Sequence, residues 1–180
     1  KEAEELLEKV RKLVKEIEDR LRKSSEENRE LVKRVEDELR ETTKKNKKLV
    51  DEIKERREKS DKDKKKVDDD IRKELEDVSR ENKEILKRIE DESRKSEEKN
   101  KKLADDVKRE LDEMRREVRE KVKDEDVLRR IEEILERVER AVREVLRRNK
   151  EINDRLRERV EDVVRKNEDI LRRVLDEVRK

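Results

Sequence analysis

Asparagine is the residue type in this sequence whose chemistry and spacing are most informative. Six of the seven asparagines form three pairs with partners 18 residues apart: Asn28, Asn46, Asn82, Asn100, Asn149 and Asn167. Each amide both donates and accepts hydrogen bonds, so a set of them can build a network. An amide is neither a nucleophile nor a base at neutral pH, and the pattern therefore predicts structural rather than catalytic chemistry.

Residues that enzymes commonly use for covalent or acid–base chemistry are missing from the 180-residue chain. It has no Cys, His, Tyr or Gly. Without Cys or His, no nucleophile–base pair of the usual kind can be assembled, and without Gly no loop can cradle a phosphate. The sequence therefore predicts no enzymatic activity and no cofactor.

Short runs of like charge are the next candidates for binding chemistry. Asp68-Asp69-Asp70 and Glu36-Asp37-Glu38 could attract a divalent cation, but they lack the loop and the glycine of a calcium site. Lysines at 44–48 and 62–66 have no aromatic residues among them on which bases could stack. Solvated helical surface is the favoured interpretation of all four runs, and we expect no metal.

Charge balance and hydropathy narrow the classes of partner further. The chain carries 59 basic and 57 acidic residues, a net charge of +2, with both signs interspersed. No large field of one sign is expected to attract nucleic acid or a membrane surface. No apolar run approaches the roughly 20 residues that cross a bilayer, and no signal-peptide pattern opens the chain. The expectation is a soluble protein whose compartment the sequence does not indicate.

An apolar repeat of 18 residues specifies the elements that must position the asparagines. It runs through Ile17, Val35, Ile53, Ile71, Ile89 and Val107. Eighteen residues make five turns at 3.6 residues per turn, so the apolar face of a straight α-helix keeps one direction without supercoiling. The apolar stripe is about 120° wide, which suits a helix packed against two neighbours.

Helical phase and an internal repeat divide the chain into three helices. Val118 and Asn149 are both central in their stripes but about 220° out of step, which places a connection near residues 123–126, with an aspartate as helix cap. Shifting the last segment back by 121 residues aligns its apolar and Asn positions with the first, ending at Lys59. The first connection then lies near residues 60–64, directly after Lys59, with Asp61 or Asp63 as the next cap.

The predicted fold is all-α: an elongated, nearly untwisted, antiparallel three-helix bundle, up-down-up in a single chain. The helices are expected at about 2–59, 64–122 and 126–180, within one domain spanning 1–180. Short connections make successive helices antiparallel.

Residue numbers place the six asparagines in two layers of this bundle. In antiparallel helices, matched residues have a constant sum of numbers. The sums Asn28 + Asn100 and Asn46 + Asn82 are both 128, and Asn100 + Asn149 and Asn82 + Asn167 are both 249. Small polar residues accompany the first layer (Ser24, Ser25, Ser96 and Asn153) and the second (Thr42, Thr43 and Ser79).

Buried amides without partners are costly, so we expect each layer to be a hydrogen-bond network that fixes register. Solvent-exposed asparagines and an amide-lined ligand or ion site are the weaker alternatives.

The 18-residue repeat, the idealised Lys/Glu/Arg surface and the Asn/Ser/Thr layers together resemble a de novo designed, parametrically generated helical bundle. That resemblance implies a structural scaffold with no natural activity, requiring no partner if it is monomeric. The alternative is a helical interaction module that self-associates or pairs with other helical chains. A more distant possibility is an electrostatic binder of acidic polymers.

Overall fold

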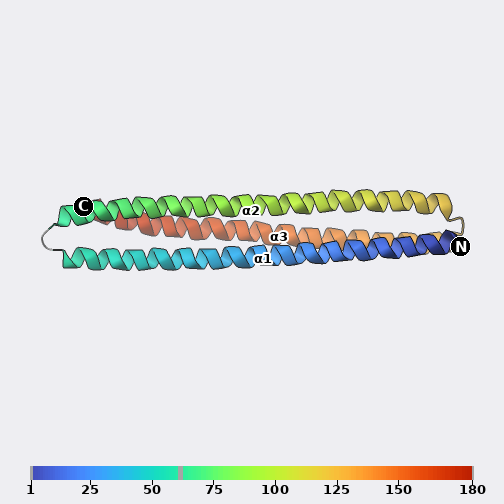
Figure 1. The fold of residues 1–180 in the computed structure, drawn as a ribbon, viewed down its shortest axis with the longest axis horizontal. Helices are drawn as coiled ribbons and strands as arrows, with labels where there is room; N and C mark the ends of the chain where they lie inside the picture. Colours follow the sequence, from blue (N-terminus) through green and yellow to red (C-terminus); the bar gives the residue numbers. More distant parts are fainter. Residues whose placement is uncertain (1, 61–62, 180) are drawn as a thin grey trace. The chain divides into compact units, whose positions relative to one another are not determined.

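Three long helices account for nearly the whole chain in the computed structural model, which describes residues 2–60 and 63–179. They are α1 (Glu2–Lys59), α2 (Lys64–Lys121) and α3 (Glu125–Arg179), shown in Figure 1. These bounds differ by at most one residue from the ranges that helical phase predicts. Helices of this length form because the sequence has neither Gly nor Pro to interrupt them and is rich in good helix formers.

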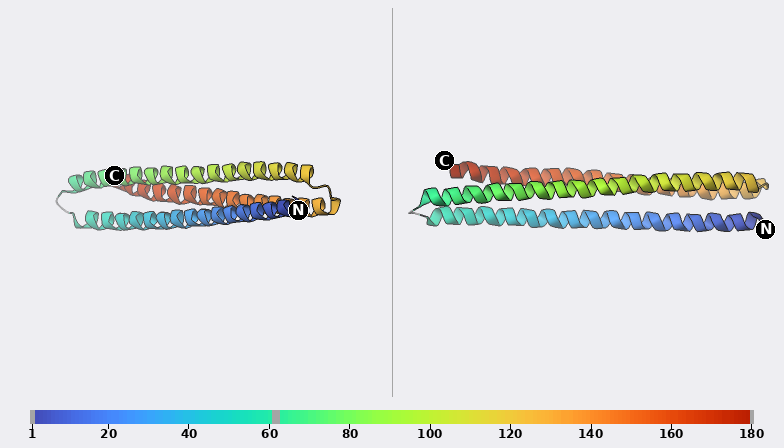
Figure 2. Two further views of the ribbon diagram at one scale, coloured as in Figure 1. Left: turned by 45° about the vertical axis from the view of Figure 1, so that its right-hand side comes forward. Right: turned by 45° about the horizontal axis from the view of Figure 1, so that its top comes forward.

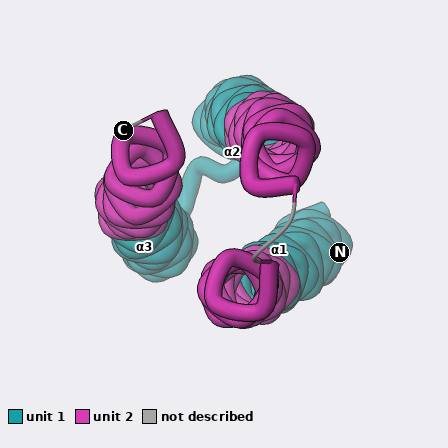
Figure 3. The backbone as a smooth tube through the Cα atoms, turned by 90° about the vertical axis from the view of Figure 1, so that its left-hand side faces the viewer, with its two compact units in different colours: residues 1–31, 94–153 teal, residues 32–93, 154–180 magenta. Residues whose placement is uncertain are grey.

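The helices pack together as a three-helix bundle, with the chain divided into two compact units. One unit consists of residues 1–31 and 94–153 and the other of residues 32–93 and 154–180 (Figure 3). Each unit contains a segment of all three helices. The predicted single domain stays a prediction, as do the straightness of the helices and the lack of twist.

The core of the first unit joins the start of α1, the end of α2 and the start of α3. This brings together Leu6, Val10, Ile17 and Leu21 with Val107, Leu111, Val118 and Val122 and with Ile131, Leu135, Val138 and Val142. Within this unit α2 is therefore antiparallel to both of its neighbours, as Figure 2 also shows. The side chains come from the predicted stripes.

The second unit repeats the arrangement with the opposite ends of the helices. Its core contains Ile53 from the end of α1, Ile71 and Leu75 from the start of α2, and Leu171, Val174 and Val178 from the end of α3. Repeated burial of the same stripe in both units confirms the three-helix fold predicted from periodicity.

The described residues at the helix ends lack the left-handed conformation that often ends a helix. No residue in the described chain has a positive φ angle. Asp124 caps α3, because its Oδ1 accepts a hydrogen bond from the Asp126 N–H at 3.0 Å. The helix thus begins with Glu125, slightly before the predicted start. Of the two predicted caps for α2, Asp63 directly precedes the helix, and Asp61 lies outside the described residues.

Candidate functional site

The candidate site consists of the polar side chains inside the bundle. Five of the six predicted asparagines are buried, at 2–5% exposure: Asn28, Asn46, Asn82, Asn149 and Asn167. Asn100 is half-buried. Each helix contributes two of the six, because the 18-residue spacing returns a side chain to the same helix face.

In the first unit, one hydroxyl group connects all three helices. Ser24 on α1 donates its hydroxyl hydrogen to Asn100 Oδ1 on α2, with 3.1 Å between the oxygens. The same Ser24 oxygen accepts a hydrogen bond from Asn149 Nδ2 on α3, also at 3.1 Å. Both the donor and the acceptor capacity of the hydroxyl are used. The structure therefore brings Asn100 and Asn149 together around a serine.

Asn28 lies beside this group but is not bonded to it. Neither Asn28 Nδ2 nor Asn28 Oδ1 has a hydrogen-bond partner, although both atoms are buried. Its side chain lines a hollow of about 340 Å³ between α1 and α2, together with Ser24, Ser96 and Asn100. Asn28 thus shares a region with its predicted layer and leaves its amide unsatisfied.

The second unit holds the other three asparagines in a looser arrangement. Asn167 Nδ2 on α3 donates to Thr43 Oγ1 on α1 at 3.4 Å, close to the outer limit for a hydrogen bond. Asn46 and Asn82 line one hollow of about 310 Å³ between α1 and α2, and the Nδ2 atoms of both are buried without a partner. In the described chain, Asn100, Asn149 and Asn167 bond to hydroxyls, and no two asparagines bond to each other.

Two buried polar residues were not identified as layer members from the sequence. Asn153 is completely buried and both polar atoms of its amide lack partners, whereas the sequence predicted only that it lies near the first layer. Ser93, 4% exposed, was not singled out at all. A signal existed, because Ser93 lies 18 residues from both Leu75 and Leu111, which are core leucines.

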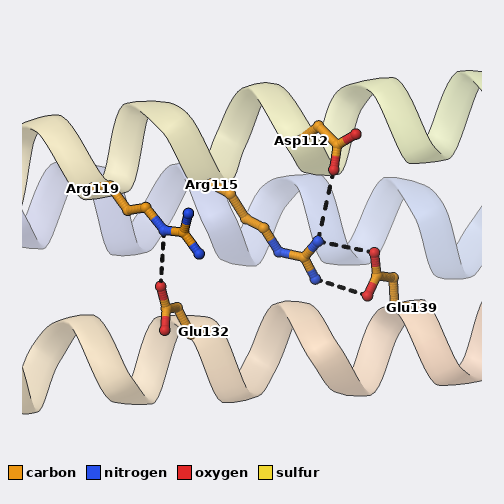
Figure 4. Close-up of polar contacts among 5 residues, drawn as sticks. All are labelled: Asp112, Arg115, Arg119, Glu132 and Glu139. Atoms are coloured by element: carbon orange, nitrogen blue, oxygen red, sulfur yellow. Dashed lines mark hydrogen bonds and ion pairs between the residues drawn. The ribbon is translucent and has the colours of Figure 1, made fainter.

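Ion pairs between helices surround these interior groups. In the first unit, Arg115 on α2 forms two hydrogen bonds with the Glu139 carboxylate on α3, at 2.9 and 2.8 Å, and lies 3.7 Å from Asp112 (Figure 4). Arg119 and Glu132 form a further pair at 3.2 Å. Hydrogen bonding to Arg115 lowers the pKa of Glu139, and the same contact raises the pKa of Arg115. The two parallel hydrogen bonds from the planar Arg115 guanidinium to Glu139 fix the relative positions of these segments of α2 and α3.

The acidic runs are part of this ion-pair surface. Asp68 lies 3.3 Å from Arg57, Glu36 lies 2.6 Å from Arg159, and Glu38 pairs with Arg88. No group of three or more Asp or Glu side chains suited to a metal occurs in the part of the chain that the structure describes. Among those residues, no helix is long and apolar enough to cross a membrane.

Comparison with known proteins yields a fold match. No protein-family model matches the sequence, and no curated protein matches it either. The chain is similar to a solved structure described as a computationally designed three helix bundle, with 19% identity, a TM-score of 0.59, and coverage of 98% of this chain and 88% of that one. The protein is therefore a three-helix bundle in fold, with Asn, Ser and Thr hydrogen bonds in its interior.

Proposed function

We propose that the protein is a structural scaffold without catalytic activity, whose interior polar layers specify how its three helices align. The Ser24 hydroxyl carries this proposal, because it joins Asn100 and Asn149 and so requires all three helices in one register. Sliding any one helix by a turn, about 5.4 Å, would break at least one of these hydrogen bonds. The fold match to a designed bundle supports the absence of a natural substrate.

The free energies involved indicate that the buried amides act on the choice of helix register more than on the stability of the fold. A buried, bonded amide adds little net stability, but a shifted register strands it at a cost of roughly 1–3 kcal/mol. Apolar side chains would tolerate a shift more easily, since Leu, Ile and Val pack with many partners. The layers thus raise the free energy of wrong alignments more than they lower that of the correct one.

Distance distributions between spin labels test the proposal. Labels at Lys12→Cys on α1 and Arg116→Cys on α2 occupy exposed sites in the first unit, and their numbers sum to 128. We expect one narrow distance in the parent. We expect a broader or multiple distribution once Ser24→Val, Asn28→Leu, Asn100→Leu and Asn149→Leu are combined, with helicity retained in circular dichroism. An equally narrow distribution in the apolar variant would contradict the register role.

A further inference from the structure

One edge of α1 carries a charge pattern that is complementary to itself. Between residues 27 and 59, ten residues of α1 fall within a sector about 80° wide beside α2, at 100° per residue. All ten are charged, and we call them the α1 edge: Glu27, Glu30, Arg34, Glu38, Glu41, Lys45, Lys48, Glu52, Arg56 and Lys59.

Reversing the direction of the α1 edge inverts every charge. Residues whose numbers sum to 86 form five pairs, and each pair has opposite signs: 27 with 59, 30 with 56, 34 with 52, 38 with 48 and 41 with 45. The spacing is also symmetric about residue 43. Two copies of the edge placed antiparallel therefore meet with opposite charges throughout.

The second unit provides a groove along this edge. Two adjoining hollows of about 310 Å³ each lie between α1 and α2 and share Thr42, Lys45, Glu81 and Ile85. Their α1 wall extends from Glu38 to Glu52, about four turns of helix. Half-buried Leu49, Val78 and Ile85 supply apolar surface in the groove. Charged side chains of both helices, among them Glu41, Lys48 and Glu84, form the rims of the groove.

Charges in the middle of the edge are not used within the chain. Glu41, Lys45, Lys48 and Glu52 form no ion pair among the residues that the structure describes. Elsewhere along the edge, three charges pair with α2: Arg34 lies 3.7 Å from Glu92, Glu38 pairs with Arg88, and Arg56 lies 2.7 Å from Glu74. These four central charges, two of each sign, remain available to an external partner.

We propose that the partner is a second copy of this chain, with α1 of each copy lying antiparallel in the α1–α2 groove of the other. The arrangement is two-fold symmetric about residue 43, so each of the five pairs forms twice. Such an interface is self-complementary, as two-fold dimers require. It adds an interaction surface to the proposed scaffold and does not depend on the interior layers.

Light scattering coupled to size exclusion gives the first test. We expect about twice the 22.2 kDa chain mass at roughly 50 mM salt and a shift toward the single-chain mass at roughly 500 mM, because exposed ion pairs are screened. A single-chain mass at every salt concentration, up to about 200 µM protein, would overturn the dimer. Helical circular dichroism in that monomer would leave the scaffold proposal standing, whereas loss of helicity would remove both.

Charge reversal gives the sharper test. Lys45→Glu with Lys48→Glu makes four of the ten pairs between copies repulsive, and so does Glu38→Lys with Glu41→Lys. Each double variant alone should run as a monomer at low salt. An equimolar mixture restores opposite charge in all ten pairs and should run at the dimer mass. A mixture that stays monomeric would refute the proposed pairing.

The matched control changes two neighbouring lysines on another face of α1. Lys44→Glu with Lys47→Glu alters the net charge by the same amount at exposed positions outside the α1 edge. This variant should keep the parent's dimer mass at low salt. Equal loss of dimer in the control would show that net charge and not the edge controls association, and would overturn the inference.

Discussion

At the scale of single residues, the interior depends on hydroxyl groups as much as on asparagines. A serine or threonine oxygen can donate one hydrogen bond and accept others, so it can serve two amides at once. Ser24 does this for Asn100 and Asn149, and Thr43 accepts from Asn167. The asparagines supply register-specific groups, and the α1 hydroxyls connect them to neighbouring helices.

Ser24→Ala should destabilise the fold by roughly 2 kcal/mol, because two amides lose their partner in the interior. Urea unfolding at pH 7, followed by circular dichroism, measures the change. Ser25→Ala is the matched control, since Ser25 is half-buried on the same helix and makes no hydrogen bond in the described structure. Equal effects of the two substitutions would contradict the bridging role of Ser24.

Asn153→Leu should have the opposite sign and stabilise the fold by roughly 1–2 kcal/mol. Asn153 is completely buried with neither amide atom bonded, so leucine removes an unsatisfied polar group and adds apolar volume. Asn149→Leu should destabilise, because it takes a donor from Ser24. The comparison uses thermal unfolding of both variants, and a loss of stability in Asn153→Leu would show that its amide is satisfied.

The sequence predicts which side chains face inward better than it predicts which atoms bond. Phase along the helix placed the six asparagines on the apolar stripe, and five of them are fully buried. Whether Asn28 bonds to its neighbours depends on side-chain rotamers and on the exact separation of polar atoms, which periodicity does not encode. The burial of Ser93 was not predicted because a single serine among leucine positions changes the periodic pattern very little.

At the scale of the elements, phase and capping together locate where helices begin and end. The break in phase after Val118 predicts a connection near residues 123–126, where α3 begins with Glu125 directly after its cap, Asp124. Phase is retained across the first connection, so only the 121-residue internal repeat located the end of α1 there. The repeat identified the end of α1 because α1 and α3 run in the same direction and both pack against α2.

Asp124→Ala should lower the free energy of unfolding by about 1 kcal/mol, because the Asp126 N–H then loses its capping acceptor. Asp124→Ser keeps a capping oxygen and should retain most of the stability. Urea unfolding of both variants beside the parent gives the two differences. Similar losses for alanine and serine would indicate that the carboxylate acts through its charge instead of through capping.

For the whole molecule, burial of the apolar stripe holds the helices together, and charge makes the stability depend on pH and salt. With 64% of its residues charged and 27% hydrophobic, the chain relies on a narrow buried stripe and on many weak exposed pairs. The ion pairs between helices join glutamate or aspartate on one helix to arginine or lysine on another. The pKa of Glu117 is lowered chiefly by its hydrogen bond to Lys121 and also by Lys9 of α1. Protonating such carboxylates weakens ion pairs between helices and so lowers the stability of the whole bundle.

Acid should therefore destabilise the bundle, and the sign follows from the lowered pKa values of Glu117 and Glu139. A carboxylate whose pKa is lower in the folded state stabilises the fold above its unfolded pKa, about 4.3 for Glu. That contribution disappears as the pH falls through the folded pKa. At the same time, protonation leaves 59 basic residues uncompensated and repulsive. The melting temperature should thus be steady from pH 7 to about 5 and fall steeply below about 4.

Glu139→Gln isolates one pair in this acid transition. At pH 7 the variant should be less stable than the parent by roughly 1 kcal/mol, because glutamine cannot form the charged fork with Arg115. The difference should shrink as the pH falls toward 3, because the lowered pKa of Glu139 is approached and protonation removes the same charge from the parent. Glu133→Gln, at an exposed site with no ion pair in the described structure, should match the parent at both pH values. A difference between Glu139→Gln and the parent that stays constant from pH 7 to 3 would mean that packing, and not the carboxylate charge, carries the contact.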